Sequence, residues 1–180
     1  MVTVNTPIQS NVMRRFRQRL GPVLNRLTGV VGQPTTQVYP SGYVATVHRP
    51  HDEVAAALEA GGFTWDPLSM FHYTPTGSST DGSWAYRSGP FAERQLHVVL
   101  FATRPDRTDV YAHDECNWLR HPLKHADEVD IRRKSGATTM RRWLADSDLP
   151  ARQHSLARRK IGHAVERLRE RLRGRGHRLR

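Results

Sequence analysis

One stretch of the chain is rich in side chains that bind metals or transfer protons. Imidazole and carboxylate groups are common ligands of zinc and of other first-row divalent ions. The residues of these types are His113, Asp114, Glu115, His121 and His125. The spacing of His121 and His125 suits two imidazoles on one helix face, but Pro122 favours His121 as a cap outside the helix. The leading prediction is therefore a protein without a cofactor. The alternative is a divalent metal ion held by ligands among His113, Glu115, His121 and His125.

His97 lies on a strand that is expected to pair with the beginning of this stretch. Two strand-like runs separated by Arg104-Pro105-Asp106-Arg107 predict a β-hairpin. A two- or four-residue loop pairs His97 with Asp114, and a one-residue slip brings His113 or Glu115 opposite instead. A carboxylate beside His97 could orient its imidazole for acid–base chemistry, which makes His97 and Asp114 the candidate catalytic residues. The favoured interpretation is an inert buried pair, because nothing else in the sequence supplies an activated nucleophile.

Charge is distributed unevenly along the chain, whose formal net charge is +11. Residues 1–38 carry five arginines and no acidic residue, for a net charge of +5. Residues 39–149 have a net charge of −3, and residues 150–180 have a net charge of +9. The basic potential therefore belongs to the two ends, where it can neutralise phosphates without adding self-repulsion to the central part.

The C-terminal segment, residues 150–180, is predicted to form a basic helix over 156–173 followed by a tail. An apolar seam with the three- and four-residue spacing of helix pairing runs along it. The seam comprises Ile161, Val165, Leu168 and Leu172. The candidate nucleic-acid-binding residues are Arg158, Arg159, Arg167, Arg169, Arg171 and Arg173. Two interpretations stay open: an arm for nucleic acid or an acidic protein surface, and a solvated helix that pairs through the seam with this domain or another chain.

The central segment, residues 39–149, has the pattern of a compact α+β domain. Strands are expected at 43–47, 70–74, 83–87, 96–103 and 108–113, and helices at 51–60, from Pro122, and at 135–144. This order predicts an antiparallel sheet of about four to five strands with helices on one face. Residues 1–38 are expected to form a basic N-terminal arm and linker, with an amphipathic helix that begins after Asn11. Basic amphipathic helices would then flank the domain at both termini.

Cysteine use and hydropathy favour a cytoplasmic protein. Cys116 is the only cysteine, which rules out an intramolecular disulfide and fits a reducing compartment. No stretch approaches the ~18 consecutive apolar residues that span a bilayer, so no transmembrane insertion is expected.

These features support three functional hypotheses. The leading one is a non-catalytic nucleic-acid-associated or accessory binding protein that uses its basic terminal helices on RNA or DNA. The first alternative is a metal-dependent phosphoester hydrolase or nuclease with a His/Asp/Glu cluster. The second alternative is a structural assembly subunit joined through the C-terminal helix, either as a helix-mediated oligomer or with another protein partner.

Overall fold

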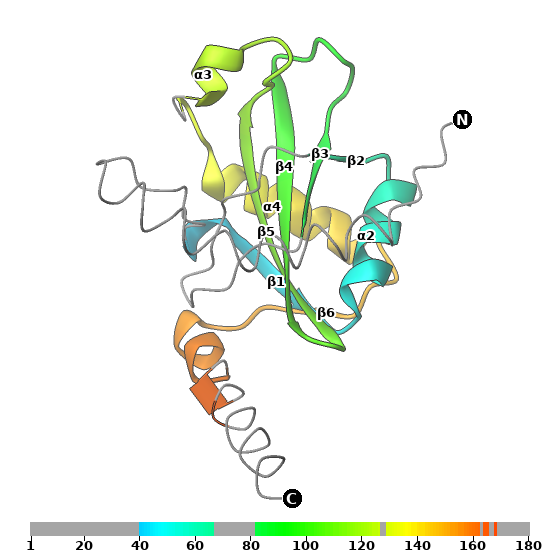
Figure 1. Cartoon of the computed structure of the whole chain (residues 1–180), viewed down its shortest axis with the longest axis vertical. Helices are drawn as coiled ribbons and strands as arrows, with labels where there is room; N and C mark the ends of the chain where they lie inside the picture. The colour runs from blue at the N-terminus through cyan, green and yellow to red at the C-terminus, as the bar shows by residue number, and fades with distance from the viewer. Residues whose placement is uncertain (1–39, 67–81, 127–128, 163, 166–167, 169–180) are drawn as a thin grey trace, which may run out of the picture.

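The computed structural model of the chain describes residues 40–66, 82–126, 129–162, 164, 165 and 168. The elements in chain order are η1 (Pro40–Gly42), β1 (Tyr43–Val47), α2 (His51–Ala60), β2 (Thr64–Trp65), β3 (Gly82–Tyr86), β4 (Arg94–Arg104), β5 (Arg107–Cys116), α3 (Pro122–Ala126), α4 (Arg133–Ala145) and β6 (Ala151–Arg152) (Figure 1). The predicted α+β class is confirmed. The expected N-terminal helix and the strand at 70–74 lie outside the described residues.

The strands form one open antiparallel sheet in the order β2-β3-β4-β5-β1-β6. Within the described residues the sheet has six strands, compared with the four to five expected from the sequence. The additional strands β2 and β6 contain two residues each, which is too short for an alternating pattern to indicate a strand. The long β4–β5 hairpin lies at the centre of the sheet and carries most of the polar residues singled out above.

The register of the β4–β5 hairpin differs by one residue from the expected one. Arg104 pairs with Arg107 at the turn, but a bulge just before Arg104 shifts the pairs that follow. His97 therefore pairs with His113, and its expected pairing with Asp114 is wrong. The bulge has this effect because an extra residue in one strand moves the following side chains to the other face.

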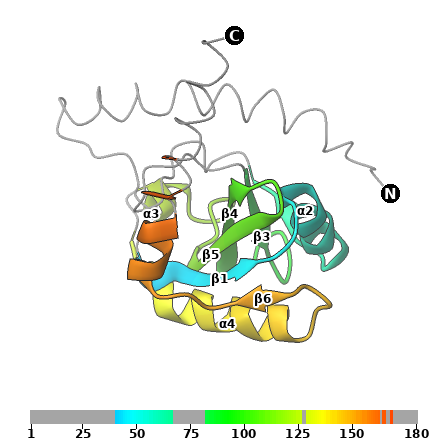
Figure 2. The same cartoon turned by 90° about the horizontal axis from the view of Figure 1, so that it is seen from below.

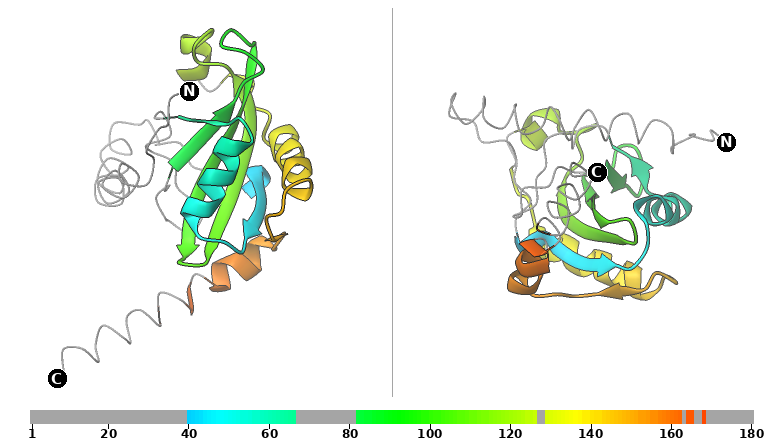
Figure 3. Two further views of the ribbon diagram at one scale, coloured as in Figure 1. Left: turned by 90° about the vertical axis from the view of Figure 1, so that its right-hand side faces the viewer. Right: turned by 60° about the horizontal axis from the view of Figure 1, so that its bottom comes forward.

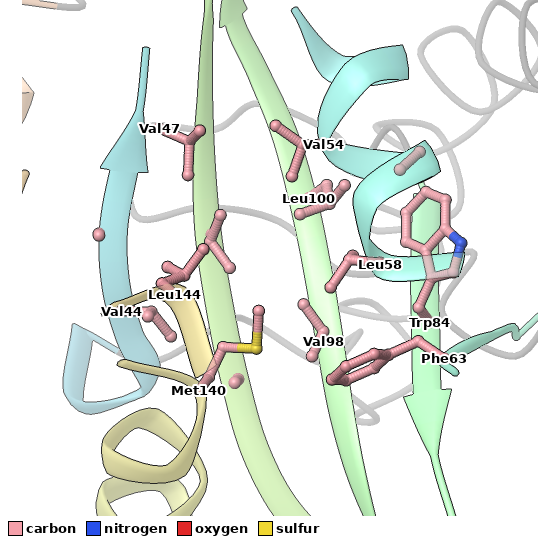
Figure 4. Packing of buried hydrophobic residues seen from close by; sticks show 14 of the residues in the cluster. Val44, Val47, Val54, Leu58, Phe63, Trp84, Val98, Leu100, Met140 and Leu144 are labelled. Carbon is pink, nitrogen blue, oxygen red and sulfur yellow. The ribbon is translucent and has the colours of Figure 1, made fainter. Parts of the chain in front are cut away.

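One face of the sheet is apolar, and α2 and α4 cover it (Figures 2 and 3). The helices on this face confirm the predicted arrangement. Figure 4 shows how side chains of both helices meet those of β1, β3 and β4. The labelled core residues are Val44, Val47, Val54, Leu58, Phe63, Trp84, Val98, Leu100, Met140 and Leu144. This core fixes the central hairpin, because alternate residues of β4 and β5 are anchored in it.

Helix α4 lies against the backbone of β5 at Gly136. A Cβ atom added to Gly136 would collide with backbone atoms of His113 and Asp114. The absence of a side chain at this position therefore permits the close approach of the helix to the strand. The contact fixes the backbone of β5 at the residues that carry the polar side chains described below.

The opposite face of the sheet carries aromatic and polar side chains, most of which are buried. Tyr43, Val99, Phe101 and Tyr111 form an aromatic cluster in its middle. Polar residues lie on both sides of this cluster, because residues two apart in a strand share a face. Those that are buried include Thr46, Asp66, Ser83, Gln95, His97, Asp109 and Glu115.

In the C-terminal segment, the described residues from Leu156 to Leu168 are helical. Three residues of the predicted apolar seam are exposed: Ile161 by 65%, Val165 by 41% and Leu168 by 57%. The fourth, Leu172, lies outside the described residues. None of the helices in the described part of the chain is long and apolar enough to span a bilayer.

Candidate functional site

Two groups of side chains on the polar face of the sheet could bind a ligand or a metal ion. The first group contains His97, His113 and Glu115, and we call it the histidine centre. The second is a pocket rich in arginine near the turn of the β4–β5 hairpin, and we call it the basic pocket. The aromatic cluster separates the two groups along the strands, so they form two distinct sites.

The histidine centre results from the observed register of β4 and β5. His97 and His113 are direct cross-strand partners, and Glu115 lies two residues farther along the same face of β5. His97 Nδ1 lies 3.2 Å from His113 Nε2 and 3.1 Å from Glu115 Oε1. His113 Nε2 lies 3.0 Å from Glu115 Oε2. The three groups are close enough to hold one metal ion.

Burial and mutual charge act in opposite directions on the pKa values of the histidine centre. Burial by itself lowers the pKa of His97, but the charge of Glu115 and the contact with its carboxylate raise it above its ordinary value. At His113 burial prevails and the pKa is lowered. Burial works to raise the pKa of Glu115, yet the two imidazoles hold it well below its ordinary value. The centre therefore contains an ionised carboxylate.

A chain of hydrogen bonds fixes the orientation of the Glu115 carboxylate. Gln95 Nε2 donates to Glu115 Oε1 over 2.6 Å, and Arg87 Nε donates to Gln95 Oε1 over 2.8 Å. Arg87 Nη2 in turn donates to Asp66 Oδ2 over 3.0 Å, and Trp118 Nε1 donates to the same oxygen over 3.2 Å. These contacts connect β4 and β5 to residues just beyond the ends of β2, β3 and β5, so the carboxylate is held by a network rather than by one neighbour.

The other two predicted metal ligands differ in their distance from this centre. His125 Nδ1 lies 3.6 Å from Glu115 Oε1 and 3.2 Å from the carbonyl oxygen of Cys116, so it lies beside the centre. His121 Nε2 instead contacts Glu93 Oε2 at 2.6 Å. The structure thus joins two of the predicted ligands to His97 and places His121 in a separate ion pair.

Asp114, the candidate catalytic partner of His97, points to the other side of the sheet because of the register shift. Its Oδ1 accepts a hydrogen bond of 2.6 Å from Arg94 Nε. Arg94 Nη1 also donates to Asp130 Oδ2 over 2.6 Å. The backbone of Asp114 bridges to Arg132. Asp114 therefore anchors β5 to the segment that leads into α4.

The basic pocket has a volume of about 410 Å³ and lies between the hairpin turn, β6 and the start of the C-terminal helix. Its basic lining residues are His48, Arg104, Arg107, Arg152, His154, Arg158 and Arg159. Asp109 is the one acidic residue among the described lining residues. The pocket therefore joins basic residues of the central segment, whose net charge is negative, to basic residues of the strongly positive C-terminal segment.

Three buried nitrogen atoms of the pocket residues have no hydrogen-bond partner among the described residues. They are Nε2 of His48, Nε of Arg107 and Nε of Arg159. Buried polar groups of proteins are normally hydrogen-bonded, so such atoms call for an explanation. Each atom has less than 1 Å² of accessible surface, so a ligand could reach it only after the side chains rearrange.

The structure describes two of the six arginines that the sequence singled out for nucleic-acid binding. Arg158 is exposed, whereas Arg159 is buried and its guanidinium lies over the ring of Tyr43. Arg167, Arg169, Arg171 and Arg173 lie outside the described residues. The pocket arginines of the central domain were missed because segment charges average them with acidic neighbours. The pair of arginines that flanks Pro105-Asp106 at the hairpin turn could have indicated a basic site there.

Comparisons of the chain with models of protein families, with curated proteins and with solved structures find no match. The fold class alone does not specify an activity, so the chemistry of the two sites is what points to a function.

Proposed function

We propose that the protein is a non-catalytic nucleic-acid-binding protein that holds the phosphate backbone in the basic pocket and along the C-terminal helix. The observation that carries this proposal is the convergence of arginines from four separate elements on one pocket. Arg104 comes from β4, Arg107 from β5, Arg152 from β6 and Arg158 from the C-terminal helix.

The chemistry of the pocket suits phosphate oxygens. Arginine presents N–H donors in a planar fork that matches phosphate geometry, and its charge is retained at all relevant pH values. A phosphate group can accept hydrogen bonds from several of the pocket arginines at once, and its negative charge favours it over a neutral ligand.

The position of the pocket favours a polymer over a small phosphorylated molecule. The pocket lies at the start of the C-terminal helix, whose first turns lead away from the sheet (Figure 1). Beyond Arg159 the sequence contains eight further lysines and arginines against two glutamates. A backbone that enters the pocket can therefore meet additional cations along the helix, and each such contact releases counterions.

A salt-titrated binding assay on the full chain tests this proposal. Fluorescence anisotropy would follow binding to single- and double-stranded RNA and DNA of unrelated sequences. The pocket variant carries Arg104→Gln, Arg107→Gln and Arg152→Gln. The control removes the same charge elsewhere through Arg120→Gln, Arg132→Gln and Arg142→Gln.

We expect the pocket variant to bind more weakly and to reduce the salt slope of duplex DNA binding by ~2–3, because each phosphate contact contributes ~0.9. The control should retain a slope close to that of the wild type. Equal slopes for the two variants, or no binding by the wild type, would contradict the proposal. Tighter binding to polyglutamate than to any nucleic acid would identify an acidic protein surface as the partner instead.

A further inference from the structure

We propose that His97, His113 and Glu115 form a binding site for one divalent first-row transition-metal ion, with Zn²⁺ as the best-matched ion. The site shares no residue with the basic pocket, so metal binding here does not depend on nucleic-acid binding.

The distances between the three groups match those of a metal coordination shell. A tetrahedral zinc site has bonds of ~2.0–2.1 Å to nitrogen and oxygen, which places neighbouring ligand atoms ~3.3 Å apart. The observed distances are 3.2 Å between His97 Nδ1 and His113 Nε2, and 3.1 Å and 3.0 Å from these atoms to the Glu115 oxygens. The two nitrogens approach different oxygens of Glu115, so an ion between the rings and the carboxylate would lie near both oxygens and would require only small outward movements of the side chains.

Hydrogen bonds alone do not satisfy the three contacts at once. His97 Nδ1 and His113 Nε2 each contact the other ring and an oxygen of Glu115. If both nitrogens carry protons, both donate to the carboxylate and two N–H groups face each other across 3.2 Å. If either nitrogen lacks its proton, its lone pair faces a carboxylate oxygen. A cation in the middle makes all three contacts favourable, since each atom then presents a lone pair to it.

The surroundings of the site hold the ligands as metal sites usually require. Metal-binding carboxylates are themselves hydrogen-bonded, and these outer contacts tune affinity. Glu115 receives such a bond from Gln95, which Arg87 holds in turn. The side chains of His97 and Glu115 are almost fully buried, whereas that of His113 retains 13% exposure. An ion would therefore be reached past His113, and three protein ligands leave one coordination position open.

The composition of the ligand set identifies the class of ion. Two imidazoles and one carboxylate suit zinc and other divalent first-row ions, whereas magnesium and calcium favour shells made of oxygen atoms. Copper(I) prefers the sulfur ligands of cysteine and methionine, and neither is among the three groups. The nearby imidazole of His125 lies beside Glu115 and adds a further nitrogen close to the site.

Calorimetric titration of the metal-free full chain with Zn²⁺ tests the proposal. The variants are His113→Ala and the nearly isosteric Glu115→Gln, and the control is His121→Ala, which removes a histidine that is paired with Glu93. We expect one tightly bound ion per wild-type chain, a loss of affinity of ~100-fold or more in both site variants, and unchanged affinity in the control. Gln95→Ala should weaken binding by ~10-fold through the loss of its outer contact.

A second measurement keeps the test valid if the site variants do not fold. Titration of the wild type with Zn²⁺ should shift the histidine side-chain NMR signals of His97 and His113 together, and Co²⁺ should give the visible absorption of a nitrogen- and oxygen-coordinated ion. The proposal is overturned if a folded His113→Ala variant binds Zn²⁺ as tightly as the wild type, or if the signals of His97 and His113 do not respond to the ion.

Discussion

The guanidinium of Arg159 lies over the aromatic ring of Tyr43, with 3.6 Å between the Arg159 Cζ atom and the ring centroid. Arg159 Nη1 also donates a hydrogen bond to Tyr111 Oη. These contacts attach the first turns of the C-terminal helix to the aromatic cluster of the sheet. Arg159 therefore supports the wall of the basic pocket, whereas its exposed neighbour Arg158 is free to meet a ligand there.

The Arg159→Gln variant should loosen this attachment. A desolvated cation over an aromatic ring contributes up to ~2 kcal/mol, and the hydrogen bond to Tyr111 adds to it. We expect hydrogen exchange of the backbone amides in 156–162 to accelerate by ~10-fold or more, because this segment then opens more readily. Arg158→Gln is the matched control and should leave these rates nearly unchanged. Equal acceleration in both variants would show that Arg159 does not anchor the helix.

Tyr111 should make the stability of the protein depend on alkaline pH. Burial raises the pKa of its phenol to about 12, although the charge of Arg159 opposes this effect. Because the pKa is higher in the folded state, the stability linked to the neutral phenol is fully present below about pH 10. It is then lost as the pH rises towards about 12. Urea unfolding at stepped pH values should show the free energy of unfolding falling over this window by up to ~2.7 kcal/mol.

The Tyr111→Phe variant provides the control for this pH dependence. Phenylalanine retains the packing of the ring and has no proton to lose, so the decline between about pH 10 and about pH 12 should become shallower. An unchanged decline in the variant would assign the effect to other groups.

The sequence predicted the helices of the central segment and the two strands of the central hairpin, though not their register, because the signals of these elements are local. Helix α2 has an acidic first turn at Asp52 and Glu53 and is followed by Gly61-Gly62, and its observed bounds agree with the expected range 51–60. The edge strands β2 and β6 could not be predicted in this way. Each contains two residues, whose pairing is decided by neighbouring strands that are distant in sequence.

The candidate sites were predictable only in part, for two physical reasons. The bulge before Arg104 shifts the register by one residue, and the turn sequence alone did not indicate that His113 would oppose His97. The prediction that a histidine or carboxylate lies near His97 in every register is confirmed all the same. The basic pocket collects residues from four elements, from Arg104 to Arg158, and no local pattern reports such a convergence.

Asp114 should matter for stability and not for metal binding. It accepts a hydrogen bond from Arg94, which also holds Asp130, so the carboxylate connects β5 to the segment before α4. In Asp114→Asn the charge-assisted contact is weakened, and we expect the free energy of unfolding in urea to fall by ~1–2 kcal/mol. Affinity for Zn²⁺ should stay within about two-fold of the wild type, since Asp114 faces away from His97. A large loss of Zn²⁺ affinity in a stably folded variant would contradict this assignment.

Gly136 should tolerate no side chain, because α4 rests directly on the backbone of β5 there. The Cβ atom of Gly136→Ala would collide with backbone atoms of His113 and Asp114, which cannot rotate away as a flexible side chain could. The helix must therefore shift outward and disturb its core contacts, and overpacking of this kind typically costs ~1–3 kcal/mol.

The matched control is Gly89→Ala, where a Cβ atom meets nothing within 4 Å. Urea unfolding of both variants should show a clear loss of stability for Gly136→Ala and a change within about ±0.5 kcal/mol for Gly89→Ala. Because the collision involves the backbone of His113, Zn²⁺ affinity should fall in Gly136→Ala even where the variant remains folded. A Gly136→Ala variant as stable as the wild type would mean that α4 does not approach β5 as closely as described.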